Sequence, residues 1–297
     1  MNCQFNDKAM VDKITVLAKK FNDNEHFESS SEYLALAELL IVLDDDGYTP
    51  TALAMIEMTK GNRDVLGLLI KIFDSNSLLS QFVVSVLVKE MESKHFDGFS
   101  TSKAFDETIR GNNMASFVLS HCFKLYGADF IASVITPLAR KVVSNGSSSI
   151  YEVDPRELKG TDNIDNHHTN LIRLTSEVMD ELMSNKEQFP EKLCCILRCI
   201  HMMLCENMGD EEALKLTGSL VLFLRYINPC LTNMEQRLGV SSSESDHRAF
   251  ENVSKLLQAA ANQQPVKQDY LRPFNNLVSH LQTDIVGLTR YLIHARK

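Results

Sequence analysis

Apolar residues recur along nearly the whole chain at intervals of three and four positions, and this spacing most constrains the fold. Such spacing places the apolar side chains on one face of an α-helix, whereas alternation would indicate a strand. The clearest run contains Met114, Phe117, Val118, His121, Cys122 and Leu125. Only 12 Gly and 7 Pro interrupt the 297 residues. The sequence therefore predicts an all-α protein with roughly a dozen helices.

Gly, Pro and polar clusters predict where these helices end. The helix that contains Met114 is expected to start near Asn112 and to end at Gly127. A further helix is expected over residues 130–143, with a kink at Pro137. The polar stretches 96–109 and 160–168 are expected to be loops, the second with two solvated histidines.

The charge and composition exclude several classes of protein. The chain carries 30 Lys and Arg against 39 Asp and Glu, a net charge of −9, which disfavours binding to nucleic acid or to anionic lipid. The most apolar stretches, Val65–Phe73 and Leu220–Leu224, are shorter than the roughly 20 residues of a membrane span. Seven irregularly spaced cysteines and the lack of a signal-peptide pattern predict a cytoplasmic protein with reduced thiols.

One group of metal-ligating residue types occurs within a predicted helix, over residues 191–205. It comprises Cys194, Cys195, Cys199, His201 and Cys205. Zinc sites usually take paired ligands that bracket a turn, so we interpret these cysteines as buried structural thiols and expect no metal and no cofactor. The chain also has no Gly-rich phosphate-binding motif. If the protein takes part in phosphate chemistry, another molecule must hold the nucleotide.

Two arginines lie in unusual places. Arg110 ends a polar stretch and precedes Gly111-Asn112-Asn113, where a flexible Gly and a capping Asn open the next helix. A cation there could reach into a partner, although most loop arginines are simply solvated. Arg225 lies in a segment that is apolar nearly all round, so its guanidinium requires carbonyl or carboxylate acceptors or must extend from the helix end to water.

The predicted helix over residues 250–262 separates an apolar face from a polar one at helical spacing. Lys255, Gln258 and Asn262 share the polar face, and Lys267 follows just beyond Pro265. This face is either a solvated surface or a polar stripe presented to a partner.

Several segments together resemble the Ras GTPase-activating protein (RasGAP) domain, most closely that of the neurofibromin type. In order along the chain they are LLIKIFDSNSLL (68–79), IRGNNMAS (109–116), FKLYGADF (123–130), EVDP (152–155), FLRYINP (223–229), SKLLQAAAN (254–262) and LRPFN (271–275). The resemblance covers roughly residues 45–285. It implies a single large helical domain over residues 46–297 with a shallow GTPase-binding groove, preceded by an accessory helical segment over residues 1–45.

The resemblance also implies a function and a set of functional residues. A domain of this type stimulates GTP hydrolysis by a GTP-bound Ras-type GTPase and so negatively regulates Ras signalling. It binds the GTPase as a monomer, without inserting into the membrane, and it turns over no substrate itself, since the partner holds GTP and Mg²⁺. The matching positions are Arg110 as arginine finger; Arg225 as holder of the finger loop; Lys255, Asn262, Lys267, Gly111 and Asn112 in GTPase binding; and Phe223, Leu224, Asn228 and Pro229 as a structural motif.

The family also includes non-catalytic GTPase-binding scaffolds, the IQ-motif-containing relatives, which lack the finger arginine. The presence of Arg110 distinguishes this chain from them and favours activation. Ile109 stands where relatives usually have Phe, the segment before Arg110 looks longer than in neurofibromin, and the run that contains Lys267 looks one residue short. Despite the net charge of −9, we expect the groove to be neutral or locally positive.

Overall fold

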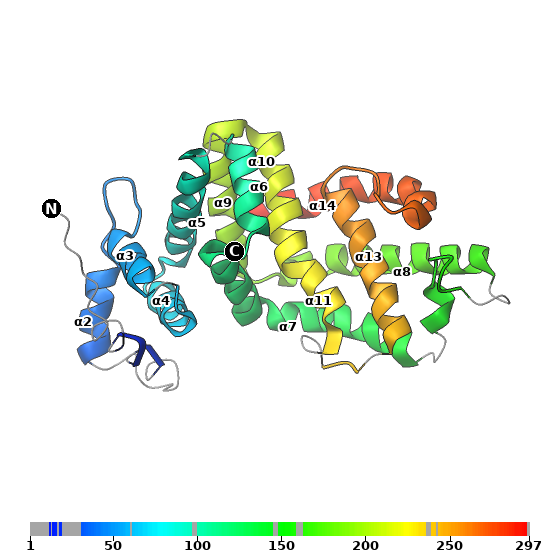
Figure 1. Cartoon of the computed structure of the whole chain (residues 1–297), viewed down its shortest axis with the longest axis horizontal. Helices are drawn as coiled ribbons and strands as arrows, with labels where there is room; N and C mark the ends of the chain where they lie inside the picture. The colour runs from blue at the N-terminus through cyan, green and yellow to red at the C-terminus, as the bar shows by residue number, and fades with distance from the viewer. Residues whose placement is uncertain are drawn as a thin grey trace. The chain divides into compact units, whose positions relative to one another are not determined.

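The computed structural model of the protein describes residues 12, 14–16, 18–19, 31–59, 61–96, 100–144, 148–158, 163–235, 239–241 and 243–295. Every regular element within these ranges is a helix, and none of their residues is in a strand (Figure 1). The prediction of an all-α protein is therefore confirmed.

The chain divides into two compact units, residues 1–122 and 123–297, with the division inside helix α7. The first unit contains α2 (Ser31–Leu40), α3 (Pro50–Met58), α4 (Arg63–Ser75), α5 (Leu79–Phe96), α6 (Thr101–Arg110) and the first part of α7 (Met114–Ser144). The second contains the rest of α7, η2 (Ser148–Tyr151), α8 (Ile164–Ser184), η3 (Lys186–Gln188), α9 (Glu191–Met208), α10 (Asp210–Leu216), η4 (Thr217–Ile227), α11 (Asn228–Thr232), α13 (Glu244–Ala261), η5 (Asp269–Phe274) and α14 (Asn275–His294).

Helix α6 replaces much of the polar loop expected over residues 96–109, so that expectation was wrong. The side chain of Ser100 caps the helix by accepting a hydrogen bond from the backbone N–H of Lys103. Ala104, Phe105 and Ile109 are fully buried and form a short apolar stripe that favours the helical conformation. This stripe is too short to be recognised in the sequence among the polar residues around it. In the structure α6 packs against α5.

Helix α7 begins at Met114 and continues through Gly127 and Pro137 to Ser144, so the predicted end at Gly127 was wrong. Gly127 does not end the helix. It instead allows Tyr226 to pack closely against α7. A Cβ atom there would lie 2.6 Å from the hydroxyl of Tyr226, which donates a 2.6 Å hydrogen bond to the Gly127 carbonyl. The ring of Tyr226 also stacks on Phe123 at 4.7 Å between centroids, within the core of the second unit.

The uninterrupted α7 is long and apolar enough, by length and composition alone, to cross a membrane over Met114–Val143. Half of its most apolar window is buried inside the protein. A core helix passes the same test, and among its residues Val118, Leu119, Val134 and Ile135 are fully buried. The helix is accounted for as part of the protein core.

Helix α8 begins at Ile164, which places both histidines of the expected loop 160–168 inside a helix. The side chain of Asn163 caps this helix. His167 is buried, and its Nδ1 lies 2.6 Å from the Glu152 carbonyl oxygen. His168 packs edge-on against Phe274. The expectation of two solvated loop histidines was therefore wrong, because both rings have packing partners that are distant in sequence.

The segment that contains FLRYINP lies in a π-helix, η4, between α10 and α11. At its end the backbone N–H of Asn228 donates to the carbonyl of Phe223, five residues earlier. Phe223, Tyr226 and Ile227 are buried, whereas Arg225 is half-buried. The wide π-turns are uncommon and occur frequently at functional sites. Apolar periodicity alone did not predict this geometry.

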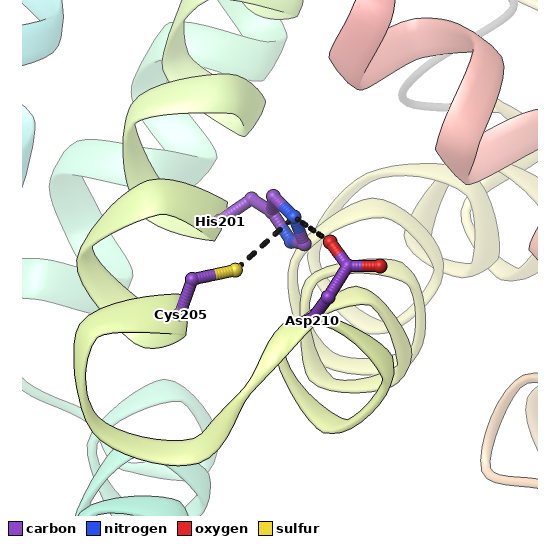
Figure 2. A group of neighbouring side chains, drawn as sticks. All are labelled: His201, Cys205 and Asp210. Carbon is purple, nitrogen blue, oxygen red and sulfur yellow. Dashed lines mark hydrogen bonds and ion pairs between the residues drawn. The ribbon is translucent and has the colours of Figure 1, made fainter.

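A sharp turn at Gly209 joins α9 to α10 (Figure 2). Gly209 has φ +80° and ψ 164°, a conformation that is essentially restricted to glycine. The turn brings Asp210 beside His201 and Cys205 of α9. Of the cysteines interpreted as buried, only Cys194 is buried; Cys195, Cys199 and Cys205 are partly exposed. That interpretation was wrong for three of the four, because helix α9 exposes one of its faces.

Candidate functional site

Arg110 is the last residue of α6, where its positive charge complements the carboxyl end of the helix dipole. Its side chain is 45% exposed. The guanidinium Nε donates to both carboxylate oxygens of Asp106, at 2.9 and 3.0 Å. An exposed pair one helical turn apart contributes only about 0.3–0.5 kcal/mol, so Asp106 holds Arg110 weakly.

The turn after Arg110 leaves little room for a side chain at Gly111. Gly111 has φ −67°, but a Cβ atom there would lie 2.7 Å from Nδ2 of Asn113 and 3.0 Å from the Glu107 carbonyl. The same Asn113 amide donates a 2.7 Å hydrogen bond to the carbonyl of Thr108. Its Oδ1 accepts the N–H of Ser116 and so caps α7. Asn113 thus ties the end of α6 to the start of α7, while Asn112 is exposed.

In the second unit, three of the predicted GTPase-binding residues line a single groove. We call it the α13 groove, and it is lined by Lys255, Gln258, Ala259, Asn262 and residues 264–268. Lys255 and Asn262 come from the polar face of α13, and Lys267 comes from the segment that leads into η5. No carboxylate is among the described residues that line this groove. It therefore presents two cations and several amides on a chain that is acidic overall.

Gln258, which was not among the predicted site residues, connects the α13 groove to the π-helix. Its Oε1 accepts a 2.8 Å hydrogen bond from the buried amide of Asn228. Its Nε2 donates to the Ser219 carbonyl at 3.1 Å and to Oδ1 of Asn262 at 3.0 Å. Gln258 was found on the polar face of its helix, but only the fold shows that it bonds to η4.

Lys255 is positioned by neighbours on η5 and on its own helix. Its Nζ lies 3.2 Å from the hydroxyl of Tyr270 and 3.9 Å from a carboxylate oxygen of Glu251. The Tyr270 hydroxyl donates in turn to Oδ1 of the buried Asn252, at 3.4 Å. These contacts hold the ammonium at the mouth of the groove while leaving it partly exposed.

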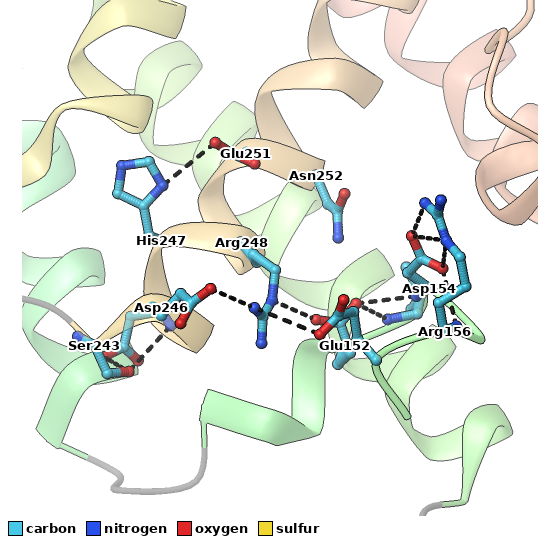
Figure 3. A network of polar contacts seen from close by, with 12 residues as sticks. Glu152, Asp154, Arg156, Ser243, Asp246, His247, Arg248, Glu251 and Asn252 are labelled. Carbon is cyan, nitrogen blue, oxygen red and sulfur yellow. Dashed lines mark hydrogen bonds and ion pairs between the residues drawn. The ribbon is translucent and has the colours of Figure 1, made fainter. Parts of the chain in front are cut away.

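The EVDP segment is held against α13 by a buried carboxylate (Figure 3). Glu152 is 6% exposed, and its Oε2 accepts a 2.8 Å hydrogen bond from Nε of Arg248. Its Oε1 accepts the backbone N–H groups of Val153 and Asp154, both at 3.0 Å. Three hydrogen-bond donors offset the desolvation cost of this buried carboxylate. This segment therefore supports α13 rather than taking part in chemistry.

A second hollow adjoins the α13 groove and shares Lys267 and Gln268 with it. The second hollow is also lined by Asp154, Arg156 and Tyr270. The Arg156 side chain donates hydrogen bonds to Asp154 and lowers the pKa of that carboxyl to about 2. Asp154 is thus ionised throughout the neutral range and offsets the charge of Arg156.

Arg225, the other predicted arginine, lies on η4 in the second unit, whereas Arg110 lies in the first. Its half-buried position agrees with an arginine at the edge of an apolar helix. That Arg225 holds the loop of Arg110 stays a prediction. Of the FLRYINP motif, Phe223 and Asn228 are buried, Leu224 and Pro229 are half-buried, and Pro229 lies in the first turn of α11.

An all-helical chain with these motifs resembles one class of protein in particular. Residues 159–262, which include the helices from α8 to α13, match the RasGAP family model, described as GTPase-activator protein for Ras-like GTPase. The chain therefore contains a RasGAP region, as the motifs predicted. The matched residues include Arg225, Asn228, Lys255 and Asn262, while Arg110 lies outside them.

Three relatives extend the similarity over more of the chain. Inhibitory regulator protein IRA2 of Saccharomyces cerevisiae is 24% identical over 196 residues, 65% of this chain and 6% of that protein. Ras GTPase-activating protein 2 of Homo sapiens is 21% identical over 225 residues, 74% of this chain and 25% of that protein. Ras GTPase-activating protein 3 of Bos taurus is 20% identical over 239 residues, 79% of this chain and 28% of that protein. The chain thus matches only a minor part of each relative, and the neurofibromin type stays a prediction.

Proposed function

We propose that this chain stimulates GTP hydrolysis by a GTP-bound, Ras-type small GTPase and so acts as a negative regulator of Ras signalling. The observation that carries the proposal is the RasGAP match over residues 159–262. Within this match, Lys255 and Asn262 line one groove, and no carboxylate is among its described lining residues. The names of the relatives, Ras GTPase-activating proteins 2 and 3, agree with this activity.

Arg110 supplies the catalytic group in trans. In phosphoryl transfer, negative charge spreads over the γ-phosphoryl oxygens, and a guanidinium stabilises that charge without losing its proton. Arg110 suits this role because it is exposed and is followed by a tightly constrained turn. The enhancement of about 10³- to 10⁵-fold known for arginine fingers in the Ras–GAP system itself sets the scale.

The other site residues position the partner and the finger. Arg225 tethers the finger loop, and Gly111 and Asn112 contact the GTPase beside Arg110. Lys255, Asn262 and Lys267 contact it along the α13 groove. The partner holds GTP and Mg²⁺, so the chain turns over no substrate by itself. It acts as a monomer in the cytoplasm and reaches the inner face of the plasma membrane through its partner.

The test is single-turnover GTP hydrolysis by a panel of Ras, Rap and Rho GTPases, with and without the protein. Arg110→Ala should lose about 10³-fold or more of the stimulation. Arg110→Lys should lose most of it, because an ammonium lacks the planar fork. Lys103→Ala, which removes an exposed cation from the same helix, is the matched control and should retain full activity. No stimulation of any Ras-subfamily member, or a fully active Arg110→Ala, would refute the proposal.

The alternative is a non-catalytic GTPase-binding scaffold. The arginine at position 110 favours activation, because the scaffold relatives lack it. The same panel distinguishes the two: a scaffold would bind Rho-type GTPases preferentially and slow their hydrolysis, with no effect of Arg110→Ala on the rate.

A further inference from the structure

A group of three potential metal ligands lies at the junction of α9 and α10, within the second unit (Figure 2). His201 and Cys205 are one helical turn apart on α9, and Asp210 follows the turn at Gly209. His201 Nε2 lies 3.0 Å from Oδ1 of Asp210 and 3.3 Å from Sγ of Cys205. One ligand atom from each residue lies within 4.8 Å of the others.

His201 Nε2 cannot both donate a hydrogen bond to Asp210 and accept one from Cys205. Both neighbours approach the same ring nitrogen of His201, and Nε2 can carry only one hydrogen. If Nε2–H donates to Asp210, the nitrogen has no lone pair to accept the thiol hydrogen of Cys205. If Nε2 is unprotonated, its lone pair faces the carboxylate of Asp210. A cation between the three would instead be attractive to all of their electron pairs.

The spacing also fits a small tetrahedral metal ion. With zinc bond lengths of about 2.0–2.3 Å, a tetrahedral site separates nitrogen from oxygen by about 3.4 Å and nitrogen from sulfur by about 3.6 Å. The separations of 3.0 and 3.3 Å need a small expansion, and the third pair, the Cys205 sulfur and the Asp210 carboxylate, lies within 4.8 Å. The side chain of Asp210 is 65% exposed, which provides a path for entry and an open fourth position.

The ligand set selects the class of metal. One imidazole, one thiolate and one carboxylate suit Zn²⁺, whereas Mg²⁺ and Ca²⁺ prefer oxygen ligands alone. Cys194, Cys195, Cys199, His201 and Cys205 lie along one helix, which by itself disfavours a metal site. Asp210 changes that picture, because the Gly209 turn gives ligands on both sides of a bend.

We propose that His201, Cys205 and Asp210 form a zinc-binding site that joins the end of α9 to the start of α10. On binding, the thiol of Cys205 gives up its proton to solvent as the Zn–S bond forms. The site lies at the first residue of the continuous helical run that contains η4 and Arg225. Zinc would therefore fix the start of that helical run to the end of α9.

The test is a titration of the metal-free protein with Zn²⁺ in competition with a chromophoric chelator. One equivalent should bind, and Cys205→Ser and Asp210→Asn should each weaken binding by about 10-fold or more. Both side chains are partly or largely exposed, so these variants should keep the fold, which circular dichroism checks. The matched control is Cys199→Ser, a partly exposed thiol on the same helix outside the cluster, and it should bind Zn²⁺ like the unaltered protein.

Substitution with Co²⁺ gives an independent readout of the ligands. The protein should show the visible bands of tetrahedral Co²⁺ together with a thiolate-to-cobalt charge-transfer band. That band should disappear in Cys205→Ser and remain in Cys199→Ser. Failure to bind one equivalent of Zn²⁺, unchanged affinity in both ligand variants, or equal loss in Cys199→Ser would overturn the proposal. None of these readouts depends on GTPase activation.

Discussion

Replacing Gln258 with Ala should loosen the contact between α13 and the π-helix. The substitution removes three hydrogen bonds, to Asn228, to the Ser219 carbonyl and to Asn262. Each contributes about 0.5–1.5 kcal/mol net. Asn262 is partly exposed and water can replace that bond, so the estimate rests mainly on the other two.

The free-energy cost of Gln258→Ala is larger than the sum expected for exposed hydrogen bonds, because Asn228 is buried. It is 6% exposed, and its Oδ1 has no hydrogen-bond partner among the described residues. Without Gln258 its amide would lose the donor contact as well, and an unsatisfied buried group costs about 1–3 kcal/mol. Because Ala has a helix propensity a few tenths of a kcal/mol better, the expected net loss is about 2 kcal/mol.

Urea denaturation followed by circular dichroism measures this loss. With a slope of about 1–3 kcal/mol per molar urea, the transition of the second unit should shift down by about 1 M. Gln264→Ala is the matched control, because this glutamine lines the same groove but is exposed, and it should shift the midpoint little. In a double-mutant cycle, Gln258→Ala and Asn228→Ala should show a coupling of about 0.5–3 kcal/mol.

The same variant separates binding from catalysis in the proposed function. The half-saturating concentration for GTPase stimulation should rise, because Asn262 loses a support, while the plateau rate should hold because Arg110 is untouched. A free energy of unfolding within about 0.5 kcal/mol of the unaltered protein, or a coupling near zero, would refute the role assigned to Gln258.

Three further predictions concern single side chains. Asp106→Asn should release Arg110 and raise GTPase stimulation at subsaturating protein by about 2-fold at most, since an exposed pair of this kind contributes about 0.3–0.5 kcal/mol; a lower rate would contradict this. Arg156 lowers the pKa of Asp154 to about 2, so the ionised carboxylate of Asp154 stabilises the folded state. This contribution is complete when the pH is above about 3.9, the ordinary pKa of Asp, and it is lost as the pH falls through about 2. A carboxyl NMR titration should show this pKa and its rise in Arg156→Ala. Burial raises the pKa of Cys122 to about 12, so it should resist iodoacetamide at pH 8 in the native state, and mass spectrometry should find modification only after unfolding.

Local patterns predicted the helical class and the polar face of α13. The apolar spacing of three and four residues is a short-range property, and so is the segregation of Lys255 and Asn262 from the apolar face of α13. Lys267, which the resemblance and not a local pattern assigned, lines the same groove. Residues on one helical face remain together whatever the helix packs against.

Predictions that relied on helix-breaking residues were less successful. Gly127 was expected to end a helix, but the hydroxyl of Tyr226 occupies the space that a side chain would need. Residues 96–109 and 160–168 were expected to be loops, although α6 and α8 occupy much of both. For Gly127 a partner distant in sequence decides the conformation, and a local pattern contains no information about that partner. Helices α6 and α8 begin instead at local caps, Ser100 and Asn163, within runs whose polar residues obscured the helical spacing.

The sequence by itself determined the all-α class, the RasGAP resemblance and the polar face of α13, because each rests on short runs of neighbouring residues. Only the tertiary structure decided that Gln258 links the groove to the π-helix, that Glu152 supports α13, and that Asp210 meets His201 and Cys205. Those contacts depend on how turns and helices bring separate segments together. Hydrogen bonding and metal ligation act over a few ångströms in space, whatever the separation along the chain.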